Sequence, residues 1–424
     1  MNELTAAPNF DQKKRQGAKI GSIASFAAIL FLTSLVFEAP FRLALDSAGL
    51  PALIYLPKVV LFLTIPLLLS SGRRLTRRSA LAFILIAIAF IYGVLSIGSV
   101  NQVTFGLWIL TPLAFGMIVS QDVLGNAQRF RTPILFLFFS ATTGIFLDTS
   151  LEFPWEGMRL DLGEASVEIS RQWTAFGIER YAGFSRASFS AAAQILVFGI
   201  WIVATQGRVW LKLSIWLLAG YAIFLTTSKG PAGAWAVLSI FFLSRHIPFA
   251  RRFIRIAWKT IAWAIATVAI LAPVSTFFID YDSKIENFTD AVLFASFGDR
   301  LTWMWPDSFS LIHAPLEWIF GRSIGGIGAA QMYFEPANYL PGDNIFVYLT
   351  VTAGVPLAIM LLILLTRRAI AALADPAQGN LVYSLTVFIL LYGIVVNIIE
   401  DPLLALILGM VISTPRSGTI FASR

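Results

Sequence analysis

Residues 79–97 read SALAFILIAIAFIYGVLSI, and no charged side chain interrupts this stretch. A bilayer core of about 30 Å is crossed by a helix of roughly 20 consecutive apolar residues. The stretch therefore predicts a transmembrane helix. It follows directly on the basic residues Arg73, Arg74, Arg77 and Arg78, and clusters of this kind favour the cytoplasmic side of a membrane.

The composition extends this prediction to the whole chain. Of the 424 residues, 57% are hydrophobic and 13% are charged, whereas soluble domains contain about 25% charged residues. This composition excludes a soluble enzyme, a disordered chain and a disulfide scaffold. The absence of cysteine excludes thiol chemistry and Cys-ligated metals, and only two histidines, His246 and His313, are present to form a metal site or a proton relay.

Apolar stretches recur along the sequence and predict an all-α polytopic membrane protein with about 12 transmembrane helices. They lie near Ile20–Phe37, Pro51–Ser70, Ser79–Ile97, Gly106–Val119, Thr132–Phe146, Ala187–Ala204, Leu213–Thr226, Pro231–Leu243, Thr260–Phe278, Ile345–Thr366, Leu381–Ile399 and Pro402–Ser413. The first stretch ends in Glu38-Ala39-Pro40, which is a poor cleavage site, so we expect a retained helix rather than a signal peptide.

The distribution of charge predicts the orientation. Lys and Arg are concentrated in alternate loops, which places both termini in the cytoplasm. Of the 24 acidic residues, only Glu3, Asp11, Asp122 and Asp375 fall on this basic side. The net charge of +7 then reflects topology rather than affinity for nucleic acid.

Two long external loops divide the chain and lie on the same face, where they can meet over a shared cavity. Loops of this length are uncommon without a function. The expected units are N-terminal helices (1–146), a first external loop (147–186), central helices (187–278), a large external loop (279–344), and C-terminal helices with a cytoplasmic tail (345–424).

Cations retained on the external face are the first candidates for binding. Lys229 lies in Thr226-Thr227-Ser228-Lys229-Gly230-Pro231, a short turn between two apolar stretches. There it must reach the interface, pair with an acid, or line a wet cavity. Arginine forks bind phosphate bidentately, and four external arginines are candidates: Arg180, Arg186, Arg300 and Arg322. The alternative for each cation is pairing with an external acid or a lipid phosphate.

Carboxylates of the second external loop are the candidates for chemistry. Asp343-Asn344 opens an apolar stretch, where it can cap a helix, serve as a general base, or do both. Asp280-Tyr281-Asp282 has the spacing of a metal-binding carboxylate pair, but a solvated acidic loop is the default interpretation. We therefore expect no bound metal.

Four motifs in this order resemble the bacterial O-antigen ligase and Wzy-type polysaccharide polymerase family. The resemblance spans about Arg180–Gly354. The segments are Arg180-Tyr181-Ala182-Gly183-Phe184; Thr227-Ser228-Lys229-Gly230; Arg300-Leu301-Thr302-Trp303-Met304-Trp305 with Pro315-Leu316-Glu317-Trp318-Ile319-Phe320-Gly321; and Asp343-Asn344-Ile345-Phe346-Val347-Tyr348-Leu349. Ligases of this family usually have His at the position of Asp343, and this difference favours a polymerase.

The resemblance implies a GT-C-like glycosyltransferase in the bacterial inner membrane, with its active site facing the periplasm. Its donor would be an oligosaccharide on a polyprenyl (undecaprenyl) diphosphate, and its acceptor a glycan hydroxyl, as in O-antigen or exopolysaccharide synthesis. Asp343 and Arg300 would be catalytic, and no cofactor would be needed. Arg180, Arg186, Lys229, Arg322 and Asn344 would bind the diphosphate or the glycan. A chain-length regulator or an export complex is a further expected partner.

Three other functions remain open from the sequence. A ligase would use the same donor with a different acceptor. A polysaccharide flippase or secondary transporter would place functional charges near the membrane midplane, where this chain has few. A scaffold of an export complex would have no turnover of its own.

Overall fold

The computed structural model describes residues 10–71, 75–162, 165–171, 174–175, 178–281, 295–375 and 378–414. Helices dominate these ranges. The N-terminal half contains α1 (Phe10–Val36), α2 (Glu38–Ser47), η1 (Pro51–Tyr55), α3 (Leu56–Ser70), α4 (Arg77–Ile97), α5 (Val100–Ile109), α6 (Thr111–Val123) and α7 (Arg131–Asp148). The central part contains α8 (Ser188–Thr205), α9 (Val209–Leu225), α10 (Lys229–Ser244), η2 (Pro248–Ala250) and α11 (Arg251–Ser275).

The remaining elements are shorter except for one long helix. They are the π-helical turn η3 (Arg300–Met304), α13 (Trp305–Ser310), α14 (Glu317–Phe320), α15 (Ala329–Phe334), η4 (Pro336–Asn338), α16 (Ile345–Ala372), α17 (Gly379–Tyr392) and α18 (Pro402–Ser413). Two small antiparallel hairpins lie between α7 and α8: β1 (Arg159–Leu162) with β2 (Ala165–Glu168), and β3 (Thr174–Ala175) with β4 (Ile178–Glu179). In the hairpin of β1 and β2, Arg159 lies opposite Glu168.

The chain is an all-α membrane protein apart from these hairpins. Among the described residues, six helical segments are long and apolar enough to cross a membrane: Pro51–Ser70, Arg77–Ile97, Val100–Val123, Ser188–Thr205, Arg251–Ser275 and Ile345–Ala372. Residues 21–47 would add a seventh segment, bent by 84° between α1 and α2. Helices α9, α17 and α18 are apolar but shorter.

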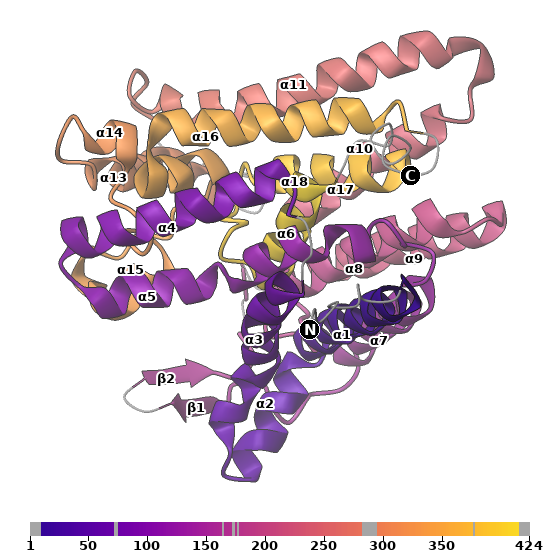
Figure 1. The fold of residues 1–424 in the computed structure, drawn as a ribbon, viewed down its shortest axis with the longest axis horizontal. Coiled ribbons are helices and arrows are strands. Elements are labelled where there is room, and N and C mark those ends of the chain that lie inside the picture. The colour runs from indigo at the N-terminus through magenta and orange to yellow at the C-terminus, as the bar shows by residue number, and fades with distance from the viewer. Residues whose placement is uncertain are drawn as a thin grey trace, which may run out of the picture.

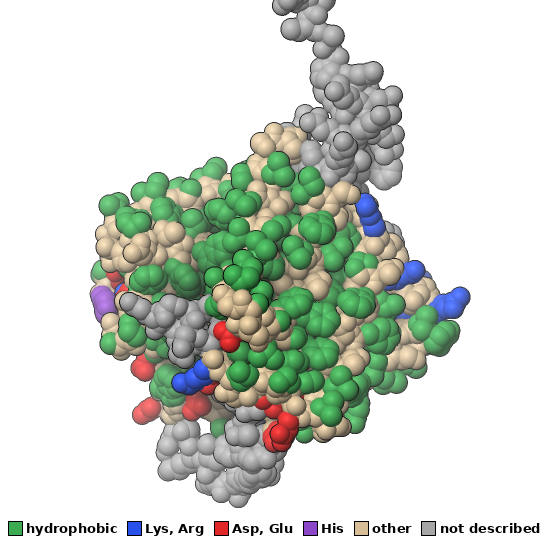
Figure 2. Space-filling model, turned by 90° about the horizontal axis from the view of Figure 1, so that it is seen from below, with side chains coloured by type: hydrophobic (Ala, Val, Ile, Leu, Met, Phe, Trp, Pro, Cys, Tyr) green, Lys and Arg blue, Asp and Glu red, His purple; other side chains and the backbone are tan. Residues whose placement is uncertain are grey.

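The long helices α4, α11 and α16 run in roughly the same direction, and the short helices α13, α14 and α15 gather at one end of them (Figure 1). On the face shown in Figure 2, hydrophobic side chains cover the middle, while most of the visible acids and most of the visible Lys and Arg lie toward different edges. A belt of apolar side chains between polar ends is what a membrane-embedded helical protein requires.

Helices α6 and α18 form the tightest crossing in the core, because glycines let their backbones touch. A Cβ atom on Gly116 would meet the carbonyl oxygen of Leu406, and one on Gly409 would meet that of Leu113. Hydroxyl groups join the same helices, because Ser120 Oγ donates to Met410 O at 2.7 Å. Small residues at helix crossings and interhelical hydrogen bonds are the usual basis of packing within a bilayer.

Two expected boundaries are wrong, for different reasons. The apolar stretch was predicted to begin near Thr260, but α11 begins at Arg251, because helical spacing exposes Arg252 and Arg255 while burying Trp258. The stretch Leu381–Ile399 was expected to be one span, but α17 ends at Tyr392 and residues 393–401 return as a non-helical segment. That segment is held by the start of α16, since Ile345 N donates to Gly393 O at 2.7 Å.

We expect Gly409→Ala to lower the thermal unfolding midpoint of the detergent-purified protein, because the added methyl group forces α6 and α18 apart. Overpacking of this kind costs about 1–3 kcal/mol. Gly233→Ala is the matched control, since a Cβ atom at this helical position meets nothing within 4 Å. Equal midpoints for the two variants would contradict the proposed close crossing.

Candidate functional site

The site is built around the start of α16, where Asn344 is the N-cap. Its Oδ1 accepts hydrogen bonds from Phe346 N at 2.7 Å and Val347 N at 3.1 Å. Its Nδ2 donates to Ala269 O of α11 at 3.2 Å and to Ile394 O at 3.0 Å. Asn344 is fully buried, and its amide is occupied by these four bonds. Asn344 therefore joins α11, α16 and the non-helical segment 393–401 that follows α17. This geometry does not support the prediction that Asn344 contacts substrate.

The preceding residue, Asp343, forms an ion pair with Arg300. The distance from Arg300 Nη2 to Asp343 Oδ2 is 2.9 Å, and the side chains are 14% and 26% exposed respectively. Trp305 Nε1 donates to Asp343 O at 3.2 Å, which fixes the backbone beside the carboxylate. Burial raises the pKa of Asp343, and Arg300 opposes that rise. The pair therefore presents a partly accessible carboxylate whose proton affinity is above that of an ordinary Asp.

Arg300 also retains unused hydrogen-bonding capacity. Its Nη1 donates to Ser296 O, whereas its buried Nε has no hydrogen-bond partner among the described residues. A buried unpaired guanidinium N–H is costly and usually marks a functional position or an absent partner. An oxyanion lying beside Arg300 would satisfy it.

Lys229 begins α10 beside this pair. The turn before it is tight: Thr227 has φ of 53°, and a Cβ atom on Gly230 would lie 2.6 Å from the ring of Tyr392 at the end of α17. Lys229 itself is exposed. Partial burial lowers the pKa of Lys229, and the charges of Arg180 and Arg300 lower it further. Arg180 and Arg300, from separate segments, therefore each lie within electrostatic range of Lys229.

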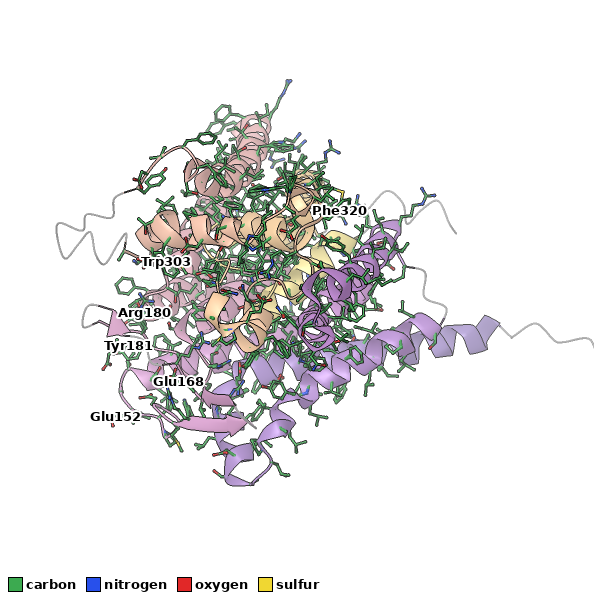
Figure 3. The ribbon with its side chains drawn as sticks, turned by 90° about the vertical axis from the view of Figure 1, so that its left-hand side faces the viewer. Glu152, Glu168, Arg180, Tyr181, Trp303 and Phe320 are labelled. Atoms are coloured by element: carbon green, nitrogen blue, oxygen red, sulfur yellow. The ribbon has the colours of Figure 1, made fainter. Side chains whose placement is uncertain are left out.

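The segment that follows Arg180 is held by a carboxylate that was not singled out from the sequence. Asp148, the last residue of α7, accepts hydrogen bonds from Ala182 N and Gly183 N, each at 2.8 Å. Burial raises the pKa of Asp148 to about 7, although the N–H of Gly183 opposes the rise. Arg180 Nε is buried without a hydrogen-bond partner among the described residues. Figure 3 shows Arg180 and Tyr181 together at the edge of the molecule.

A polar cavity of about 500 Å³ opens beside this arginine. Its lining includes carboxylates, two guanidinium groups and an aromatic ring: Asp148, Glu152, Glu156, Arg171, Arg180 and Tyr181. Carboxylates accept hydrogen bonds from hydroxyl groups, and aromatic rings offer apolar faces. The cavity therefore suits a polar, hydroxyl-rich ligand.

Glu400 is a second acid that the sequence reasoning did not single out. Both of its oxygens accept from Ala329 N at 3.0 Å, and Tyr348 OH donates to Oε1 at 3.4 Å. Gly328, with φ of 78°, leaves room for this carboxylate. Burial raises the pKa of Glu400 to about 7, and the charge of Asp343 contributes to the rise. The available signal was the pair Glu400-Asp401 between two apolar stretches.

Two predicted arginines belong to other networks. Arg322 Nη2 pairs with Glu335 Oε2 at 3.2 Å, its Nη1 donates to Gly326 O at 2.8 Å, and Gln102 of α5 binds the same carboxylate at 2.6 Å. These contacts tie α5 to the segment 279–344, and Arg322 interacts with Glu335 and Gly326 rather than with Asp343, the partner of Arg300. Arg186 lies with Arg42 and Arg171, whose charges lower its pKa after the larger effect of burial. Asp280 and Asp282 were interpreted as part of a solvated acidic loop, and residue 282 lies outside the described ranges.

An apolar cavity of about 330 Å³ lies among α4, α6, α16 and α18. Tyr348, which binds Glu400, is part of its lining, as is Arg78 at the start of α4. The rest of the lining is almost entirely aliphatic, for example Leu85, Leu357 and Leu361. Such a cavity suits a hydrocarbon chain.

Comparison of the protein sequence and structure with family models, curated proteins and solved structures gives no match.

The raised pKa values predict a pH dependence of stability. The pKa of Glu400 rises from 4.5 to about 7 in the folded protein. The folded state therefore binds this proton more tightly, and the stabilisation is complete below about pH 4.5 and is lost as the pH rises through about 7. We expect the wild-type thermal midpoint to fall by a few °C between pH 5 and pH 8.

Glu400→Gln removes the titrating group while keeping its shape, so this variant should show a smaller fall across the same interval. Glu168→Gln is the matched control, because Glu168 forms only an exposed pair with Arg159. The assignment fails if the Glu400→Gln and wild-type midpoints follow parallel curves across this pH interval.

Proposed function

We propose that the chain is a membrane glycosyltransferase that transfers oligosaccharide from a polyprenyl-diphosphate donor to a glycan hydroxyl, acting as a polysaccharide polymerase. The observation that carries this proposal is that Arg180 and Arg300 both lie within electrostatic range of Lys229, while Arg300 pairs with the partly accessible carboxylate of Asp343. Converging cations suit a diphosphate, and a neighbouring carboxylate suits a nucleophilic hydroxyl. The ordered motifs described above support the same assignment.

The reaction divides between these groups. The acceptor hydroxyl oxygen bonds to the anomeric carbon of the donor while the bond from that carbon to the diphosphate oxygen breaks. The hydroxyl proton passes to Asp343, whose raised pKa suits a proton acceptor better than an ordinary Asp. The lipid diphosphate leaves with the bonding electron pair. Lys229, Arg180 and Arg300 stabilise the negative charge that grows on it, and such preorganised charge is usually a large part of catalysis.

The apolar cavity supports a lipid-linked donor. Its lining includes Tyr348, whose hydroxyl reaches Glu400, and Glu400 in turn lies within electrostatic range of Asp343. A hydrocarbon chain in this cavity would therefore contact a residue that is connected through Glu400 to the proposed site. Its aliphatic lining would contribute binding energy in proportion to the apolar area that is covered.

We further propose the finer topology that the sequence predicts: 12 crossings, GT-C-like, both termini in the cytoplasm, and the site on the periplasmic face of the bacterial inner membrane. Helices α1, α7, α9, α10, α17 and α18 would provide the six crossings beyond the six long segments. The separation of acidic from basic side chains in Figure 2 supports this orientation. A ligase with the same donor is the second candidate, because the diphosphate site would be the same.

We expect Lys229→Ala and Asp343→Asn each to abolish long glycan chains, with a rate of transfer lowered about 10²–10³-fold, as for the loss of one preorganised charge. The assay uses full-length protein reconstituted with a lipid-diphosphate oligosaccharide, and the products are separated by length. Arg159→Ala is the matched control, because this external arginine makes only an exposed pair at 3.5 Å. It should retain the wild-type product ladder.

The same assay separates the alternatives. A ladder of products supports the polymerase, whereas a single transfer to another acceptor supports the ligase. Movement of the lipid across vesicles without bond formation, or wild-type ladders from both site variants, would contradict the proposed function.

A further inference from the structure

A second group of arginines lies apart from the ion pair of Arg300 and Asp343, and backbone contacts fix its three segments together. Ala39 N of α2 donates to Phe184 O at 3.0 Å, and Arg171 N donates to Arg186 O at 2.8 Å. Beneath them is a small apolar core of Ala39, Trp155 and Ile169. The arginines Arg42, Arg171 and Arg186 therefore project from a rigid support, and we call them the second arginine group.

Burial makes this group different from a solvated basic surface. Arg42 is 5% exposed. Its Nε and Nη2 donate to Glu38 Oε1 at 3.0 and 2.7 Å, whereas its buried Nη1 has no hydrogen-bond partner among the described residues. Arg186 Nε is also buried without a hydrogen-bond partner among the described residues. Two buried donors on neighbouring guanidinium groups thus lack an acceptor, and native structures normally satisfy such donors.

The acids nearest to Arg42 and Arg186 leave the two buried donors unsatisfied. Glu38 pairs with Arg42, and its charge raises the pKa of Arg186, whereas the charges of Arg42 and Arg171 lower it. Asp401 lies within electrostatic range of Glu38, but its Oδ1 accepts from Leu404 N at 2.9 Å as the cap of α18. Arg42 Nη1 and Arg186 Nε therefore have no acceptor among the described residues.

The position of the group connects it to the proposed reaction. Arg171 lines the same polar cavity of about 500 Å³ as Arg180. Arg171 and Asp343 also both act on the hydroxyl group of Tyr339. A ligand that fills the cavity would therefore reach Arg180 at one point and Arg171, one member of the second arginine group, at another.

We propose that Arg42, Arg171 and Arg186 form a second oxyanion-binding site, which holds a carboxylate or phosphate group of the acceptor. The unsatisfied guanidinium donors and the shared cavity carry this inference. Binding of an anion at this site does not depend on the proposed function. The assignment of that anion to the acceptor does rest on the proposed function. An acidic sugar and a second lipid phosphate are the two sources of such a group, and different probes distinguish them.

The test measures binding of small anions to full-length protein in nanodiscs. The protein carries Lys229→Gln, which weakens anion binding by Lys229, Arg180 and Arg300. The probes are sodium phosphate, sodium D-glucuronate and neutral D-glucose at constant ionic strength, and calorimetry gives each affinity. We expect Arg171→Gln and Arg186→Gln to weaken binding of at least one anion about tenfold, as for the loss of a hydrogen bond to a charged group. The affinity for glucose should be the same in every variant.

Two further variants sharpen the result. Glu38→Gln removes the internal competitor for Arg42 and should tighten anion binding, while Arg159→Gln, an exposed external arginine, should leave it unchanged. Stronger binding of glucuronate assigns the site to an acidic sugar, and stronger binding of phosphate assigns it to a lipid phosphate. Unchanged affinity in both Arg171→Gln and Arg186→Gln, or no anion binding in the background protein, would overturn the proposal.

This readout is separate from glycosyl transfer. If the reconstituted protein fails to lengthen glycans but these arginine variants lose anion binding, the proposed function fails and the second site stands. If transfer is observed but anion binding is unaffected by the variants, the second site fails and the function stands.

Discussion

The structure depends on how polar groups are satisfied at the buried start of α16. The N-terminus of a helix exposes N–H groups that need acceptors, and within an apolar protein interior no water supplies them. Asn344 provides the acceptor and, with its amide N–H groups, holds α11 and the return after α17. Asp343, the next residue toward the N-terminus, faces Arg300. Consecutive residues thus fix the helix packing and position the carboxylate of the site.

The same constraint explains why the cations are informative. Charges near a membrane are costly unless they are paired or hydrated. Arg180 and Arg300 nevertheless lie close enough to Lys229 to lower its pKa, and one N–H on each arginine is buried without an acceptor in the part of the chain that the structure describes. An anionic ligand would relieve both the repulsion and the missing hydrogen bonds. Binding would therefore stabilise the folded protein, as expected for a ligand that binds only the native state.

The sequence predicted the parts of the fold and site that depend on local pattern. Uninterrupted apolar residues identified α4, and the short turn before Pro231 identified Lys229 as a cation at a helix end. The non-helical segment at residues 393–401 could not be predicted, because Gly393-Ile394-Val395-Val396 is as apolar as the preceding helix. Only the hydrogen bond from Ile345 N to Gly393 O reveals the break. The roles of Glu400 and Arg322 likewise depend on distant partners, Ala329 and Glu335.

The most direct test of the central claim is the affinity of the purified protein for inorganic pyrophosphate, measured by calorimetry in wild type, Arg300→Gln and Asp343→Asn. If Arg300 belongs to an anion site that Asp343 partly neutralises, Arg300→Gln weakens binding about tenfold and Asp343→Asn strengthens it. If the ion pair serves only to hold the loop, both variants bind pyrophosphate as the wild type does, and that result would contradict the account.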